Sequence, residues 1–72
     1  MKKKTRRAIE GMKGREVAYI YYQDKAGPQH ISGLVEKVTD KGIKLEGCYT
    51  VAWFDIETFV SDNKRFIKQD LR

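Results

Sequence analysis

Two hydrophobic periodicities divide the chain near Arg15. Before this point the apolar residues fall at i, i+1 and i+4, as they do along one side of a helix: Ala8, Ile9 and Met12. We therefore predict a short helix over 6–13, with the hydroxyl of Thr5 as its N-cap, Gly14 at its end and residues 1–4 disordered. About two helical turns are not stable alone in water. This helix must dock on the domain, pair with another chain, or fray.

After Arg15 the apolar residues recur at alternate positions, and β-branched and aromatic side chains predominate, which predicts strands. The expected strands are 16–23, 30–38, 43–46, 49–53 and 57–60. Turn residues separate them at 24–28, 39–42 and 47–48, and a single tight helical turn is expected at 54–56. Gly33 lies inside the second strand and indicates a sharp bend or a bulge, as in small barrels where one strand serves two sheets.

This order predicts an all-β fold, a five-stranded and strongly bent small barrel of the SH3 or Sm type with a short N-terminal helix. We divide the chain into a basic arm and short helix (1–14), the barrel (15–60) and a basic C-terminal tail or short helix (61–72). Ser61 or Asp62 would cap that last helix, and a frayed tail is the alternative.

The first strand is apolar on both faces. One face carries Val17, Tyr19 and Tyr21, and the other carries Ala18, Ile20 and Tyr22. A strand of this kind is typically covered on both sides. We expect the core against one face and a helix or another subunit against the other, which predicts self-association as a dimer or ring.

Length and composition limit the classes of protein to which this chain can belong. The chain has 72 residues, enough for one domain, and its single cysteine, Cys48, cannot form a disulfide within the chain. A lone cysteine is typical of a reducing compartment, so we expect a cytoplasmic protein. No apolar run approaches the ~18 residues of a membrane span, so no membrane partner is expected.

Charge is unevenly distributed. Residues 1–15 carry seven basic side chains and one acidic, residues 16–60 carry four basic and seven acidic, and residues 61–72 carry four basic and two acidic. A polyanion would therefore meet the terminal arm rather than a basic face on the body. The alternative is an arm that only keeps the protein soluble.

Cations neutralise phosphates and aromatic rings stack on bases, so these residue types mark candidate nucleic-acid contacts. The expected contacts are Lys2, Lys3, Lys4, Arg6, Arg7, Lys13, Arg15, Lys41 and Tyr22. The candidate protein-interface residues are Tyr19, Tyr21, Tyr22 and Trp53. In so small a domain most aromatics are needed in the core, so we expect Trp53 to be buried and Tyr22 to be partly exposed.

Catalysis is not expected, and neither a cofactor nor a metal is predicted. His30 and Cys48 are the only residues of their kinds and do not make a zinc site, which needs three or four ligands. Asp55 and Glu57 are two apart and would project to one side of an extended segment, but such a pair is usually a solvated turn. No glycine loop for phosphates is present. An enzyme would require catalytic groups from a partner chain.

The chain has a short basic helix, then residues 14–17 at the start of the first strand and residues 31–35 in the second. This order of elements resembles the Sm-like (Hfq-like) small β-barrel family. The pattern GREVAYIYYQD…HISGLVEKVTDKGIKLE…VAWFDIETFV, over about 9–60, looks closer still to the YolD-like group of small bacterial and phage proteins. The first resemblance implies rings or dimers formed through edge strands. It also implies an RNA-base pocket at 39–42 and 54–56, although no asparagine follows Asp40 and no Arg-Gly pair is present. The second implies an accessory role in DNA-damage response.

Two functions follow as expectations. The first is a non-enzymatic regulatory protein that binds RNA or DNA through its basic arm, 2–15. The alternative is a protein-interaction module of the phage or mobile-element type, which docks on another protein through exposed edge strands and aromatics.

Overall fold

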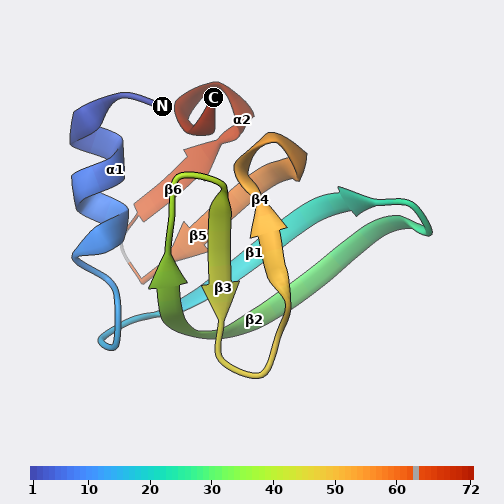
Figure 1. Ribbon diagram of the computed structural model, residues 1–72, viewed down its shortest axis with the longest axis horizontal. Coiled ribbons are helices and arrows are strands. Elements are labelled where there is room, and N and C mark those ends of the chain that lie inside the picture. The colour runs from blue at the N-terminus through green and yellow to red at the C-terminus, as the bar shows by residue number, and fades with distance from the viewer. Residues whose placement is uncertain (63) are drawn as a thin grey trace.

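The computed structural model describes residues 1–62 and 64–72 (Figure 1). The elements in chain order are α1 (Lys3–Glu10), β1 (Val17–Asp24), β2 (Gly27–Val38), β3 (Gly42–Leu45), β4 (Thr50–Ala52), the 3₁₀ turn η1 (Trp53–Asp55), β5 (Ile56–Ser61), β6 (Lys64–Ile67) and α2 (Lys68–Leu71). The predicted β-rich class with a short N-terminal helix is confirmed, and so is the single helical turn before β5.

The six strands form one antiparallel sheet in the order β4-β3-β2-β1-β5-β6. The prediction of a five-stranded barrel is wrong in two respects, because there is a sixth strand and the sheet is not closed among the described residues. Ser61 and Asp62 do not cap a helix. Instead the chain turns back and β6 pairs with β5, where Phe66 packs edge-on against Phe59 with ring centroids 5.8 Å apart.

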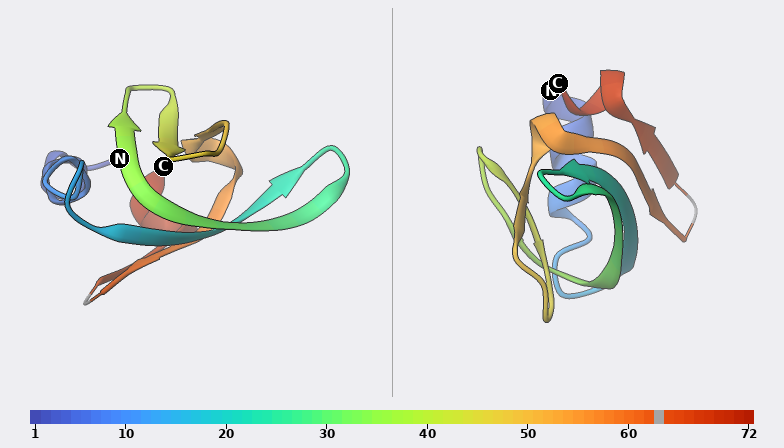
Figure 2. Two further views of the ribbon diagram at one scale, coloured as in Figure 1. Left: turned by 90° about the horizontal axis from the view of Figure 1, so that it is seen from below. Right: turned by 90° about the vertical axis from the view of Figure 1, so that its right-hand side faces the viewer.

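The long strand β2 bends so that its two halves belong to different parts of the sheet, as Figure 2 shows. It pairs with β1 up to Leu34 and with β3 from Val35 onward. At the bend, a Cβ on Gly33 would lie 3.0 Å from the carbonyl oxygen of Glu46, so the absence of a side chain permits the close approach. The bend predicted from Gly33 is confirmed, although the two halves of β2 pair with different strands of one continuous sheet rather than with two sheets.

The turn from β2 to β3 is equally restrictive. Thr39 N–H donates to the carbonyl oxygen of Gly42 at 2.9 Å, which closes the predicted tight turn. A Cβ on Gly42 would lie 2.1 Å from the carbonyl oxygen of Val51 on β4. Glycine at this position therefore sets how closely β3 and β4 approach.

Helix α1 begins earlier than predicted. It starts at Lys3, so the expectation of disorder over 1–4 is wrong, and Thr5 lies inside the helix rather than capping it. Good helix formers at 3–8 extend the helix toward the N-terminus. The helix ends at Glu10, and turns continue to Arg15, with Gly14 at φ 70°. Of its three predicted fates, docking on the domain is the one observed.

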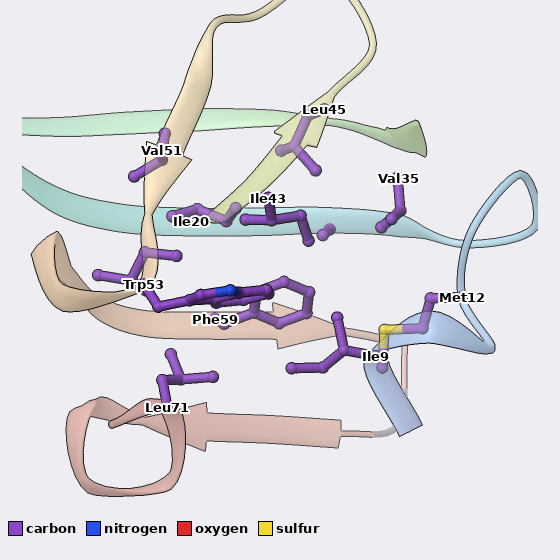
Figure 3. Packing of buried hydrophobic residues seen from close by; sticks show 12 residues of the cluster. Ile9, Met12, Ile20, Val35, Ile43, Leu45, Val51, Trp53, Phe59 and Leu71 are labelled. Carbon is purple, nitrogen blue, oxygen red and sulfur yellow. The ribbon is translucent and has the colours of Figure 1, made fainter. Parts of the chain in front are cut away.

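The core is a single cluster to which α1, most of the strands, η1 and α2 contribute (Figure 3). Its members are Ile9, Met12, Ala18, Ile20, Val35, Ile43, Leu45, Val51, Trp53, Ile56, Phe59 and Leu71. The rings of Trp53 and Phe59 lie near the middle, and the indole N–H of Trp53 donates to the carbonyl oxygen of Thr39 at 2.8 Å. Trp53 is buried, as expected.

Strand β1 is extended as predicted, but only one of its faces is covered. Ala18 and Ile20 are buried, whereas Val17 is 41% exposed and Tyr19 is 58% exposed. The expectation that both faces are covered is wrong for a single chain, because α1 packs with Ile9 against the same side as Ile20. The other side of the strand is open to solvent.

Candidate nucleic-acid interface

Helix α1 and the edge strand β6 lie side by side (Figure 1). Side chains of both line a shallow groove of 410 Å³. Its lining residues are Lys4, Thr5, Ala8, Lys64, Arg65 and Phe66. We call it the α1–β6 groove. Three cationic side chains and no carboxylate line the groove, and the ring of Phe66 adds apolar surface to it. Burial of Ile9 and Met12 fixes α1 on one side, and the contact between Phe66 and Phe59 fixes β6 on the other.

The basic residues of the arm do not all face this groove. Lys4 lines it, while Lys3 and Arg7 line a neighbouring hollow of 300 Å³ on the same helix. Both hollows are therefore edged by exposed cations. The remaining expected contacts, Lys2, Lys13, Arg15 and Lys41, are exposed but do not line the groove.

Arg6 differs from the other cations of the arm because carboxylates already surround it. Its Nη1 donates to Oδ1 of Asp40 at 3.0 Å, and its Nε lies 3.4 Å from Oε2 of Glu10. Only 26% of its side chain is exposed. Arg6 thus links α1 to the turn between β2 and β3, and its charge is largely compensated within the chain.

The two turns that the Sm-like resemblance marks for an RNA base do meet in the structure. The backbone N–H of Trp53 donates to the carbonyl oxygen of Lys41 at 3.2 Å, and both turns line a hollow of 520 Å³. The chain's own side chains occupy its rim: Asp40 binds Arg6, and the guanidinium of Arg72 lies 4.4 Å from the centre of the Phe54 ring. This hollow is therefore a weaker candidate for a base than an open aromatic surface.

An open aromatic surface is formed by β1, β2, β5 and β6 on the side away from the core. The strand register places Tyr19 between Ser32 and Val60, and Tyr21 between His30 and Thr58. We call this side the outer face; Val17, Arg65 and Ile67 also lie on it, by alternation and register. A hollow of 310 Å³ lies over the two tyrosines.

The four aromatic residues predicted for an interface have different fates. Tyr19 is well exposed, and Tyr21 is half-buried beside His30, with ring centroids 4.7 Å apart and planes inclined by 32°. Tyr22 is half-buried and packs against the core, while Trp53 lies inside the core. Tyr19 and Tyr21 are therefore the two of the four that lie on a solvent-facing surface outside the core.

Sequence reasoning missed Lys64, Arg65 and Phe66. A signal for them was present, since Asp62-Asn63 is a turn-forming pair ahead of a short run that ends in Phe66-Ile67. Such a run predicts a returning strand as well as it predicts a helix. The neighbourhood of Lys64 and Lys4 follows only from the fold.

Groups considered for catalysis are dispersed. Lys68 Nζ lies 3.3 Å from Oε2 of Glu57, and Asp55 is exposed in η1. Over residues 1–62 and 64–72, no group of three or more His, Cys, Asp and Glu side chains is arranged to hold a metal ion. None of the helices in that part of the chain is long and apolar enough to cross a membrane.

No family model matches this chain, and neither the curated proteins nor the solved structures give a match. Its function must therefore be argued from its own residues and their geometry.

Proposed function

We propose that this chain is a non-enzymatic regulatory protein that binds RNA or DNA, with the α1–β6 groove as its phosphate-binding surface. The observation that supports this most directly is the lining of the groove, where Lys4, Lys64 and Arg65 meet without a carboxylate. Phosphates attract such a surface and release counterions when they bind it. The middle of the chain, residues 16–60, has more acidic than basic side chains and so attracts a polyanion less than the ends do.

The number of available cations sets the expected salt dependence. Counting the groove and the adjoining side of α1, five cations are exposed: Lys3, Lys4, Arg7, Lys64 and Arg65. If each neutralises one phosphate, log K falls with log salt with a slope of about −3.5 for single strands and about −4.5 for B-form DNA. Affinity for single strands then falls about a hundredfold from about 50 to 200 mM salt.

A matched pair of variants tests the groove. In fluorescence anisotropy with a short labelled oligonucleotide, the Lys64→Gln/Arg65→Gln variant should bind more weakly, and its salt slope should be less steep by about 1.4 to 1.8. The control, Lys25→Gln/Lys37→Gln, removes the same charge from exposed sites that do not line the groove. Equal weakening by both variants would show a response to net charge alone. Failure of the native chain to bind at low salt would refute the function.

A protein-interaction module is the second candidate, and β4 supports it. This strand ends the sheet, so among the described residues one of its edges has no partner strand. Beside it Tyr49 is 92% exposed and Phe54 is 72% exposed. An open edge flanked by aromatic rings accepts an added strand from another protein or from a second copy in a dimer or ring. Light scattering tests the self-pairing version: mass should rise with concentration and fall back in a Tyr49→Ser variant.

A further inference from the structure

We infer that the nucleic acid bound at the α1–β6 groove is single-stranded, and that its unpaired bases stack on Tyr19 and Tyr21 of the outer face. This rests on the proposed function and specifies its substrate class. The groove would hold phosphates, and the tyrosines would hold the bases of the same strand.

Continuity between the two surfaces is the first support. Arg65 lines the groove, and in the strand register it lies opposite Val60, which lies opposite Tyr19. Two strand spacings separate Arg65 from Tyr19, so their backbones are about 10 Å apart. A chain whose phosphate binds Arg65 therefore reaches the tyrosine with a neighbouring base.

The exposure of the tyrosine rings is the second observation that supports base stacking. Tyr19 is 58% exposed although its neighbours in the sheet hold it in place. The ring pair of Tyr21 and His30 widens the platform, and the hollow above it holds 310 Å³. Stacking needs a base whose flat side is free, which a single strand offers and an intact duplex does not.

Charge favours a polyanion over a second copy of the chain on this face. Ser32, Thr58 and Val60 carry no charge around the tyrosines, and the adjoining edge strand begins with Lys64 and Arg65. The acid next to Thr58 in the chain, Glu57, is paired with Lys68 at 3.3 Å, and Asp62 follows β5. The chain has a net charge of +5, so two copies repel each other, whereas a phosphate chain is attracted.

The test compares one labelled oligonucleotide as a single strand and as a duplex, in anisotropy at fixed low salt. We expect the single strand to bind at least tenfold more tightly. Tyr19→Ala should weaken single-strand binding by about fivefold to a hundredfold, the range of one lost stacked base, and leave the salt slope unchanged. Tyr19→Phe should restore binding, because the ring is kept. Gln23→Ala is the control, since Gln23 is exposed on the same strand, β1, and lines neither the groove nor the hollow on the outer face.

The outcomes separate the two proposals. Tighter binding of the duplex, or native affinity in Tyr19→Ala, would overturn stacking while the groove variants still report phosphate binding. No binding of either form would overturn the proposed function itself. A concentration-dependent mass that Tyr19→Ala abolishes, with unchanged nucleic-acid affinity, would identify a second copy as the occupant and refute the inference. Circular dichroism of each variant checks that the fold is kept.

Discussion

The two faces of the sheet formed by β1, β2, β5 and β6 are built from alternate residues of the same strands, yet one face forms the core and the other is exposed to solvent. On the inner face Ile20 is 1% exposed and Phe59 is fully buried, whereas on the outer face Tyr19 is 58% exposed and Val17 is 41% exposed. Strand β1 is apolar on both of its faces in the sequence. Position in the fold, rather than hydrophobicity, decides which face becomes core.

The difference comes from where the helix docks. Ile9 of α1 and Met12 of the turn that follows it add to the inner cluster, and Leu71 of α2 closes it. A chain of this size has too few elements to cover both sides of its sheet. The uncovered side keeps aromatic surface that a larger protein would bury, and this surface is the one we propose for ligand binding.

The largest expected effect comes from the inner face. Phe59→Ala should lower the free energy of unfolding by about 3–5 kcal/mol, because the ring leaves a cavity at the centre of the core. That loss is comparable to the whole stability of so small a domain. Urea unfolding followed by circular dichroism measures it. The milder Phe59→Leu keeps a folded reference, and a change below about 1 kcal/mol in Phe59→Ala would contradict the assignment of Phe59 to the core.

A smaller effect is expected where α1 is tied to the sheet. Arg6→Met keeps apolar stem contacts but removes the ion pair with Asp40, and it should lower stability by about 0.5–1 kcal/mol. The value is modest because the Asp40 side chain is 98% exposed and solvent screens the pair. A double-mutant cycle with Asp40→Asn isolates the coupling. Coupling that persists in high salt would argue against a screened surface pair.

The smallest effect is expected on the outer face. Tyr19→Ser should change the free energy of unfolding by no more than about 0.5–1 kcal/mol, since the ring is mostly in water and contributes chiefly to cross-strand contacts. The same urea titration measures it. A loss as large as that of Phe59→Ala would show that the outer face is covered in solution, and would remove the contrast between the two faces.

Part of this fold can be predicted from the sequence, because the relevant signals are local. Alternation in Val17–Asp24 and the glycines at 33 and 42 mark strands, a bend and a turn without knowledge of their neighbours. Strand β6 is different: Lys64–Ile67 is four residues long and two of them are charged, so only its pairing with β5 makes it a strand.

The candidate site was less predictable than the fold. The charge of the arm indicated an anionic ligand, but α1 and β6 are about 60 residues apart in sequence, and no local pattern brings Lys4 to Lys64. Nor does a pattern show that Arg6, alone among similar cations, is paired with Asp40. These facts depend on how helix and sheet pack.

The turn that ends at Gly42 limits which amino-acid substitutions this chain tolerates. The carbonyl oxygen of Val51 occupies the space that any side chain at 42 would need, and two residues earlier Asp40 anchors the helix. Any replacement of Gly42 would therefore push β3 and β4 apart, and a replacement of Asp40 would remove the ion pair that links α1 to this turn. Variation can accumulate at the hairpin tip around Lys25 with far less consequence.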